Sequence, residues 1–193
     1  MKATEPIRNR KHIREMGAYY LKRGKLRNYL LIVLGVQTGL RISDLLRLTW
    51  DDVRDEESGC FRSHLRLTER KTGKQKVVAL SKPVLAALNI YFSATAANQP
   101  HDFLFHSSRK AGSPIGRTQA WRIVKVAALA VGVAGCIGCH SLRKTLGYHA
   151  WKSGVKVVLL MDIFNHSSFD VTKRYLGISQ DERDKVYLNL ALF

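Results

Sequence analysis

Residues 26–34 read Leu-Arg-Asn-Tyr-Leu-Leu-Ile-Val-Leu, and this run is apolar at almost every position. Such a run is typical of a helix buried on all sides, so we expect the centre of the fold here. The pair Thr38-Gly39 follows and predicts the end of the helix in a tight turn. A short helix over 42–48 is expected next, with its leucine side chains facing inward.

Beyond residue 60 the pattern changes to alternation between apolar and polar residues. The alternation runs over 61–67, an apolar run follows at 77–80, and the basic string Lys71-Thr72-Gly73-Lys74 lies between them. Two such runs around a glycine-containing turn predict a β-hairpin, here with a basic tip. Ser81 then predicts an N-cap, with Pro83 in the first turn of a helix that reaches about residue 96.

The second half of the chain has helical periodicity again. The expected fold class is therefore α+β and predominantly helical: a compact helical domain with one small antiparallel β-sheet. We expect one domain over 1–193, because no linker, repeat or low-complexity segment interrupts it. The helices expected in this half cover 117–131, 141–153, 156–164, 168–176 and a last one that opens with the capping-box string 179–182.

Composition excludes several classes of protein. Of the 193 residues, 46% are hydrophobic and 24% are charged, which excludes a disordered chain. No apolar run reaches the roughly 18 residues that a membrane span requires. Residues 1–17 contain no apolar stretch of the kind found in signal peptides, so we expect the chain to stay in the cytoplasm.

The net charge of +17 indicates a polyanionic partner. Nucleic acid is the first candidate and an acidic membrane surface the second, while a basic surface kept for solubility is the alternative. The distribution argues against that alternative. Residues 1–27 contain nine Lys/Arg and two Glu, and residues 106–125 contain five Lys/Arg and no acid. We expect these clusters, including the basic N-terminal segment 1–25, to follow a phosphate backbone.

The cysteines offer a motif that we do not take as a cofactor site. Cys136-Ile137-Gly138-Cys139-His140 matches the string to which c-type haem is attached. Haem attachment of that kind needs an exported chain, and a structural zinc site needs about four ligands. We interpret the string as small side chains in a glycine-rich turn, and we expect neither a cofactor nor a metal.

Four short stretches contain residues that can act on a phosphate. Arg41 follows a turn at the start of a helix, where its planar fork suits a pair of phosphate oxygens; the alternative is a salt bridge to Asp44. His140 and Arg143 are spaced to share one helix face, or they are an ordinary surface pair. His166 and Tyr175, taken alone, would more often be a core histidine and a packed aromatic residue.

The order and the sequences of these stretches resemble those of the catalytic domain of tyrosine recombinases, the phage-integrase family. The resemblance covers residues 26–178 and rests on Thr-Gly-Leu-Arg-Ile-Ser-Asp at 38–44, Lys-Thr-Gly-Lys at 71–74, His-Ser-Leu-Arg-Lys-Thr at 140–145, Asn-His-Ser-Ser at 165–168 and Tyr175. It implies the fold of DNA breaking-rejoining enzymes, with Asp44 in a supporting role. The catalytic residues that it implies are Arg41, Lys71, His140, Arg143, His166 and Tyr175. Contacts with DNA are expected from Lys11, Arg14, Lys74, Arg109, Arg117 and Lys144.

The chain departs from the family pattern at three points. Phe164-Asn165 stands where Leu-Gly commonly precedes the second histidine, and Lys144 stands where a histidine often follows the second arginine. Neither change removes a catalytic group. The third departure is length: the usual N-terminal helical domain is missing, so we expect either a catalytic domain that acts alone or part of a longer protein.

The resemblance implies a site-specific recombinase or integrase of a mobile element, which cleaves DNA through a 3′-phosphotyrosyl intermediate without a metal or ATP. The resemblance also implies a DNA-associated protein encoded by a bacterium or a phage, with double-stranded DNA as its partner. We expect a homo-tetramer on that DNA and a monomer or weak oligomer when free. The alternatives are relaxation of DNA by a type IB topoisomerase mechanism, or a DNA-binding regulator that kept the fold without activity. The apolar C-terminal segment 179–193 is expected to pack on its own core or to dock on a neighbouring protomer.

Overall fold

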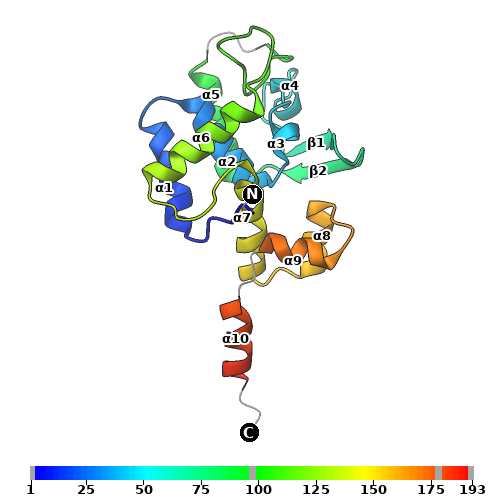
Figure 1. Ribbon diagram of the computed structural model, residues 1–193. Helices are drawn as coiled ribbons and strands as arrows, with labels where there is room; N and C mark the ends of the chain where they lie inside the picture. Colours follow the sequence, from blue (N-terminus) through cyan, green and yellow to red (C-terminus); the bar gives the residue numbers. More distant parts are fainter. Residues whose placement is uncertain (1–2, 96–98, 177–179, 191–193) are drawn as a thin grey trace.

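The computed structural model describes residues 3–95, 99–176 and 180–190. It shows a mainly helical body with one antiparallel β-hairpin at its side (Figure 1). This confirms the predicted fold class. The elements are α1 (Arg10–Leu21), α2 (Leu26–Thr38), α3 (Ile42–Leu45), α4 (Trp50–Val53), β1 (His64–Thr68), β2 (Gln75–Ala79), α5 (Lys82–Ser93), α6 (Arg117–Ala130), α7 (Cys139–Lys152), α8 (Val157–Phe164), α9 (Phe169–Leu176) and α10 (Gln180–Asn189).

Helix α2 is the centre of the core, as its apolar sequence predicts. Its leucines Leu30, Leu31 and Leu34 are completely buried, and it packs against α1, α5 and α7. At Gly35 a methyl group would lie 2.5 Å from Leu142 of α7, so only glycine allows the two helices to approach this closely. Gly39 then ends α2 with a φ of 58°, the left-handed conformation that glycine adopts most easily.

The β-hairpin pairs His64 with Ala79 and Thr68 with Gln75, and its basic turn lies beyond that last pair. The predicted hairpin is therefore confirmed, with a shorter first strand. Phe61 lies outside this ladder and forms an isolated bridge with Arg54. Figure 1 shows the hairpin reaching past α3 on the side of the molecule that also holds α8 and α9.

The N-terminal region differs most from its sequence-based description. Residues 10–21 form α1, whose Met16 and Tyr20 are buried against the rest of the core. Ahead of α1, the chain crosses α7: the backbone N–H of Ile7 donates to Thr145 and that of Glu5 to the Cys136 carbonyl. The basic segment 1–25 is thus in large part a structural element of the domain.

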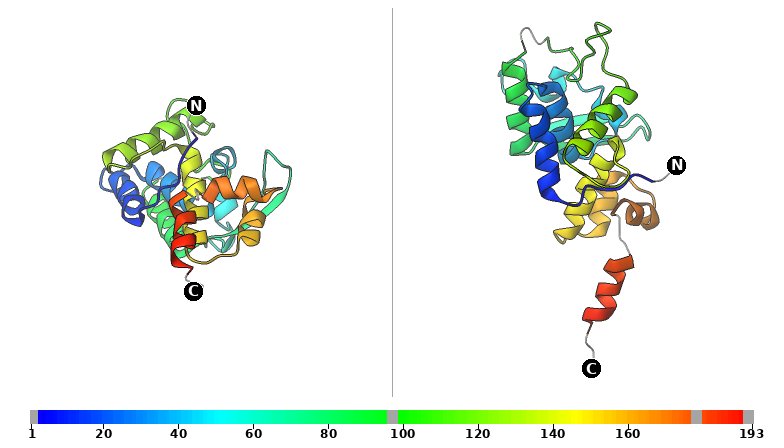
Figure 2. Two further views of the ribbon diagram at one scale, coloured as in Figure 1. Left: turned by 60° about the horizontal axis from the view of Figure 1, so that its bottom comes forward. Right: turned by 60° about the vertical axis from the view of Figure 1, so that its left-hand side comes forward.

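Several predicted helix limits shift by one to three residues. Helix α3 ends at Leu45 and α7 begins at Cys139, while the predicted capping residue Ser179 lies outside the described residues. Helix α10 stands away from the body in Figure 1 and in the right-hand view of Figure 2. Within the described ranges, no helix combines the length and apolar character needed to cross a membrane.

Candidate active site

Arg41 lies at the start of α3, immediately after the turn that closes α2. Its side chain is 17% exposed, and its Nη1 atom lies 2.6 Å from Oε2 of the fully buried Glu69. The salt bridge to Asp44 that the sequence suggested is not the pair that forms. Asp44 instead accepts a hydrogen bond from the backbone N–H of Arg70, which fastens the hairpin to α3.

Arg143 is fully buried on α7 and joins the ends of two other helices. Its terminal nitrogens donate to the carbonyl oxygens of Gly39, at the end of α2, and Phe164, at the end of α8. Its guanidinium carbon also lies 5.9 Å from the centre of the Tyr175 ring. Burial, followed by the neighbouring Arg41, lowers the pKa of Arg143, while Tyr175 and Glu69 oppose that shift. The structure therefore places the two arginines near each other.

Tyr175 on α9 lies between the two predicted histidines. The ring centroids are 4.8 Å apart for His140 and Tyr175 and 4.4 Å apart for His166 and Tyr175, both edge to face. Nδ1 of His166 lies 3.0 Å from the Thr172 hydroxyl, a contact that orients the ring. Five of the six predicted catalytic residues thus converge from four separate parts of the chain.

Both histidines have low pKa values. Desolvation by the surrounding protein is the larger cause for His140, although the residue is exposed overall, and the cations Lys144 and Arg143 add to it; its pKa is about 4. Burial, then Arg143 and Arg41, likewise lowers the pKa of His166 to about 4. Both rings are therefore neutral at pH 7, which suits a proton acceptor next to a tyrosine hydroxyl.

Unsatisfied polar atoms are concentrated at this site. Across the described ranges, four buried side-chain atoms have no hydrogen-bond partner. Native structures leave few buried polar atoms unpaired, and those that remain call for an explanation. The four atoms, all in residues at or next to the two arginines, are Arg41 Nη1, Asp44 Oδ2, Glu69 Oε1 and Arg143 Nε.

Glu69 and Lys76 belong to this site, and sequence reasoning missed both. Glu69 ends the hydrogen-bonded part of the hairpin, and Lys76 donates from β2 to the Ile163 carbonyl and lies 3.8 Å from Glu69. Burial, followed by Arg143, lowers the pKa of Lys76 to about 8. Alternation along β2 places Lys76 on the face opposite Val77, but alternation does not tell which face meets the active site.

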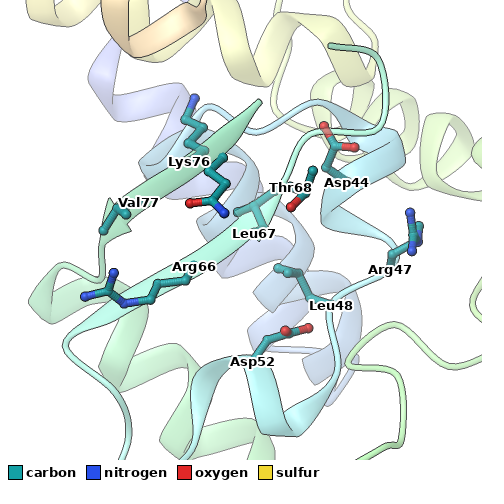
Figure 3. Close-up of a pocket in the computed structure, with 10 residues that line it drawn as sticks. Asp44, Arg47, Leu48, Asp52, Arg66, Leu67, Thr68, Lys76 and Val77 are labelled. Carbon is teal, nitrogen blue, oxygen red and sulfur yellow. The ribbon is translucent and has the colours of Figure 1, made fainter. Parts of the chain in front are cut away.

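A pocket of about 520 Å³ lies between the hairpin and the α3–α4 segment. Figure 3 shows Lys76 and Asp44 towards one end of this pocket, with Arg66 and Asp52 towards the other. The walls of the pocket therefore carry charges of both signs.

Lys71, the sixth predicted catalytic residue, is exposed in the turn of the hairpin, as is Lys74. Lys71 is near enough to contribute to the low pKa of His140. Lys144 has a different environment from the one expected of a DNA contact, because it is only 9% exposed. Its Nζ donates to the Thr4 carbonyl and lies 5.7 Å from the Tyr175 ring, which favours a role beside Tyr175.

The remaining predicted DNA contacts all lie on the surface. They are exposed side chains on α1, on the loop before α6 and on the first turn of α6: Lys11, Arg14, Arg109 and Arg117. Their roles remain predictions. Cys136 and Cys139 lie just before and at the start of α7, and among the described residues no three His, Cys, Asp or Glu side chains form a metal-binding group.

Comparison with known proteins places the chain among recombinases. Residues 10–182 match the model of the phage integrase family. A probable integrase/recombinase, YoeC of Bacillus subtilis strain 168, is 37% identical over 187 residues, which are 97% of either chain. A tyrosine recombinase of Pseudothermotoga lettingae is 29% identical over 81% of this chain, which spans only 51% of that relative.

Solved structures agree with this assignment at the level of the fold. The crystal structure of XerA recombinase superposes with a TM-score of 0.76 at 17% identity, covering 100% of this chain and 68% of that one. XerH site-specific recombinase, bound to its difH substrate after cleavage, gives 0.74 at 18% identity and covers 97% and 53%. On the match of residues 10–182 and the likeness to YoeC, the chain belongs to the phage integrase family.

Proposed function

We propose that this protein is a site-specific DNA recombinase that cleaves and rejoins DNA through Tyr175. The observation that carries the proposal is the position of Tyr175 between two neutral histidines and against the buried Arg143. A tyrosine hydroxyl has an ordinary pKa of about 10 and needs such help to act as a nucleophile at neutral pH.

In the proposed reaction, the Tyr175 oxygen forms a bond to phosphorus and the bond from phosphorus to the 5′-oxygen breaks. His140 accepts the hydroxyl proton, and Lys71 gives a proton to the departing oxygen. Arg41 and Arg143 stabilise the charge that develops on the non-bridging oxygens. The products are a 3′-phosphotyrosyl link and a free 5′-hydroxyl, and the 5′-hydroxyl of another strand reverses the step.

The test is the capture of a covalent protein–DNA adduct. The protein is incubated with a library of short nicked duplexes whose central bases are randomised, denatured in detergent, and separated from free DNA. We expect an adduct whose bound DNA shares a sequence, which defines a cleavage duplex for further work. If no adduct forms under any condition in which the protein binds DNA, the chain is a binding protein and the proposal is wrong.

The low pKa values of the histidines predict how stability depends on pH. As pH falls from about 6.5 towards 4, the unfolded chain takes up protons at His140 and His166 that the folded chain does not, so the free energy of unfolding decreases. Above pH 6.5 this contribution is fully present. Urea unfolding at pH 7 and pH 5 measures it: we expect a smaller difference in a His166→Asn variant, and an unchanged difference would contradict the low pKa.

The general-acid role of Lys71 predicts a specific rescue. Lys71→Ala should slow cleavage about 10²- to 10⁴-fold on ordinary DNA. A cleavage duplex with sulfur in place of the departing 5′-oxygen needs no proton donor, so the variant should cleave it nearly as fast as the wild type. Lys74→Ala, in the same turn, is the matched control. If the sulfur-containing duplex restored cleavage by a Lys76→Ala variant and not by Lys71→Ala, the general acid would be Lys76.

Helix α10 favours strand exchange, which needs several protomers, over relaxation by a monomer. Its apolar side chains Val186, Tyr187 and Leu188 are 62–82% exposed, and the helix stands away from the body (Figure 1). We propose that it docks on a neighbouring protomer in a tetramer on DNA. Removing residues 186–193 should leave a stable monomer that binds the cleavage duplex but assembles poorly, as native gels would show. Normal assembly, or a loss of stability in the free protein, would contradict docking in trans.

A further inference from the structure

We infer that Glu69 is a positioning residue of the strand-transfer reaction: its carboxylate holds Arg41 and links the hairpin to the loop that carries His166. The inference rests on the proposed function and concerns the same site. Glu69 does not touch the predicted nucleophile; it acts through the residues that it holds. Its partners are Arg41, Thr72, Lys76 and Asn165, and together these five residues form the Glu69 network.

The carboxylate is held from several sides. Its Oε2 atom lies 2.6 Å from Arg41 Nη1 and accepts hydrogen bonds from the Thr72 hydroxyl at 2.9 Å and the Asn165 amide at 3.0 Å. Burial alone would raise the pKa of Glu69, but the neighbouring Asn165, Arg41 and Thr72 outweigh it and lower the pKa to about 2. Glu69 is therefore charged at neutral pH.

Arg41 needs this partner to keep one orientation. Within the described residues, Glu69 is the only acidic group in an ion pair with Arg41. A guanidinium has five N–H donors, so a contact through Nη1 leaves others for a phosphate. A carboxylate that is completely buried and held by one ion pair and two hydrogen bonds cannot easily move aside. This favours a positioning role for Glu69 over an inhibitory contact that DNA must displace.

Asn165 extends the network to the second histidine. It ends α8 with a φ of 49°, the only positive φ of a non-glycine residue in the described part of the chain. Asparagine tolerates this conformation better than most residues, although glycine would adopt it more easily. The side-chain amide of Asn165 donates a hydrogen bond to Glu69. This bond ties the backbone just before His166 to the hairpin. The strained residue thus has a structural purpose at the site.

The chief test is Glu69→Gln, which keeps the shape and removes the charge. We expect DNA binding to be unchanged and adduct formation with the cleavage duplex to slow by about 10- to 100-fold, the size typical of residues that orient catalytic groups. Asn165→Gly should slow adduct formation less than Glu69→Gln does. The double variant Glu69→Gln/Asn165→Gly should be no slower than Glu69→Gln alone, because both substitutions act on the hydrogen bond between Asn165 and Glu69. Asp55→Asn, which alters a surface ion pair with Arg62, is the matched control.

A substrate change separates positioning from general damage. In a methylphosphonate linkage, one charged non-bridging oxygen is replaced by a methyl group, so less charge develops for Arg41 to stabilise. If Glu69 acts through Arg41, the factor by which Glu69→Gln slows cleavage should be smaller on this substrate than on ordinary DNA. The same reduction is expected for Arg41→Ala. An equal deficit on both substrates would overturn the inference.

The outcomes also separate this inference from the proposed function. If the wild type forms no adduct, the proposed function fails; if the wild type forms it and Glu69→Gln forms it as fast or faster, only the role of Glu69 fails. Should Glu69→Gln not fold, Asn165→Gly decides in its place, since it removes only a side-chain amide at a position that favours glycine. A wild-type rate in a folded Asn165→Gly protein would then overturn the inference.

Discussion

Replacing Tyr175 with phenylalanine should abolish the covalent adduct while leaving folding and DNA binding close to those of the wild type. The substitution removes one oxygen from a ring that packs edge to face on His140 and His166 and near Phe164, and none of these ring contacts requires the hydroxyl. The reaction, in contrast, has no nucleophile without it. Denaturing gels with the cleavage duplex measure the adduct, and gel shifts measure binding.

Tyr187→Phe is the matched control for this experiment. Tyr187 is 79% exposed on α10, away from the two arginines, so its variant should form adduct at the wild-type rate. An adduct in Tyr175→Phe that disappears in Tyr187→Phe would move the nucleophile to α10. The active site would then be completed by a neighbouring protomer.

Arg41→Ala should lower the rate of cleavage by about 10²- to 10³-fold, as expected when one donor to a developing oxyanion is lost. Binding should change little, because we expect many other Lys and Arg side chains to contact the phosphate backbone. The test compares single-turnover cleavage rates with equilibrium binding on the same duplex. Normal cleavage with weaker binding would show that Arg41 is a binding residue and not a catalytic one.

Arg143→Ala should lower the rate of cleavage at least as much, but lost catalysis and lost stability would both contribute. Arg143 is completely buried and donates to the carbonyls of Gly39 and Phe164, so its loss also releases the ends of α2 and α8. We expect a lower free energy of unfolding, on the order of 1–3 kcal/mol for the groups left unpaired. Arg41→Ala also removes the ion-pair partner of the buried Glu69, so the free energy of unfolding is measured beside the cleavage rate for both variants. Arg62→Ala, at a surface ion pair, serves as the control.

Much of the fold follows from local patterns in the sequence. The apolar run at 26–34 predicts the central helix, and alternation around the turn at residues 71–74 predicts the hairpin; both are present. Helix α1 was not predicted, because Met16 and Tyr20 stand among so many cations that charge hides the apolar spacing. Its burial depends on partners that lie far away in the chain.

The candidate site, like the fold, could be predicted from the sequence only in part. Resemblance names Arg41, His140, Arg143, His166 and Tyr175, and the fold brings their side chains together. It does not name Glu69, because an acid in a basic hairpin suggests solvent exposure until tertiary contacts bury it. Asn165 appeared only as a departure from the family pattern, and the reason for it, a left-handed backbone with an amide that reaches Glu69, requires the structure.

The most direct test of the account is to identify the amino acid and the DNA end that are joined in the trapped adduct. The adduct is digested with protease and nuclease, and the nucleotide-bearing peptide is sequenced by mass spectrometry. We predict a 3′-phosphate joined to the Tyr175 oxygen, with a free 5′-hydroxyl on the other DNA fragment. A nucleotide on any other residue, or a link through a 5′-phosphate, would contradict the account.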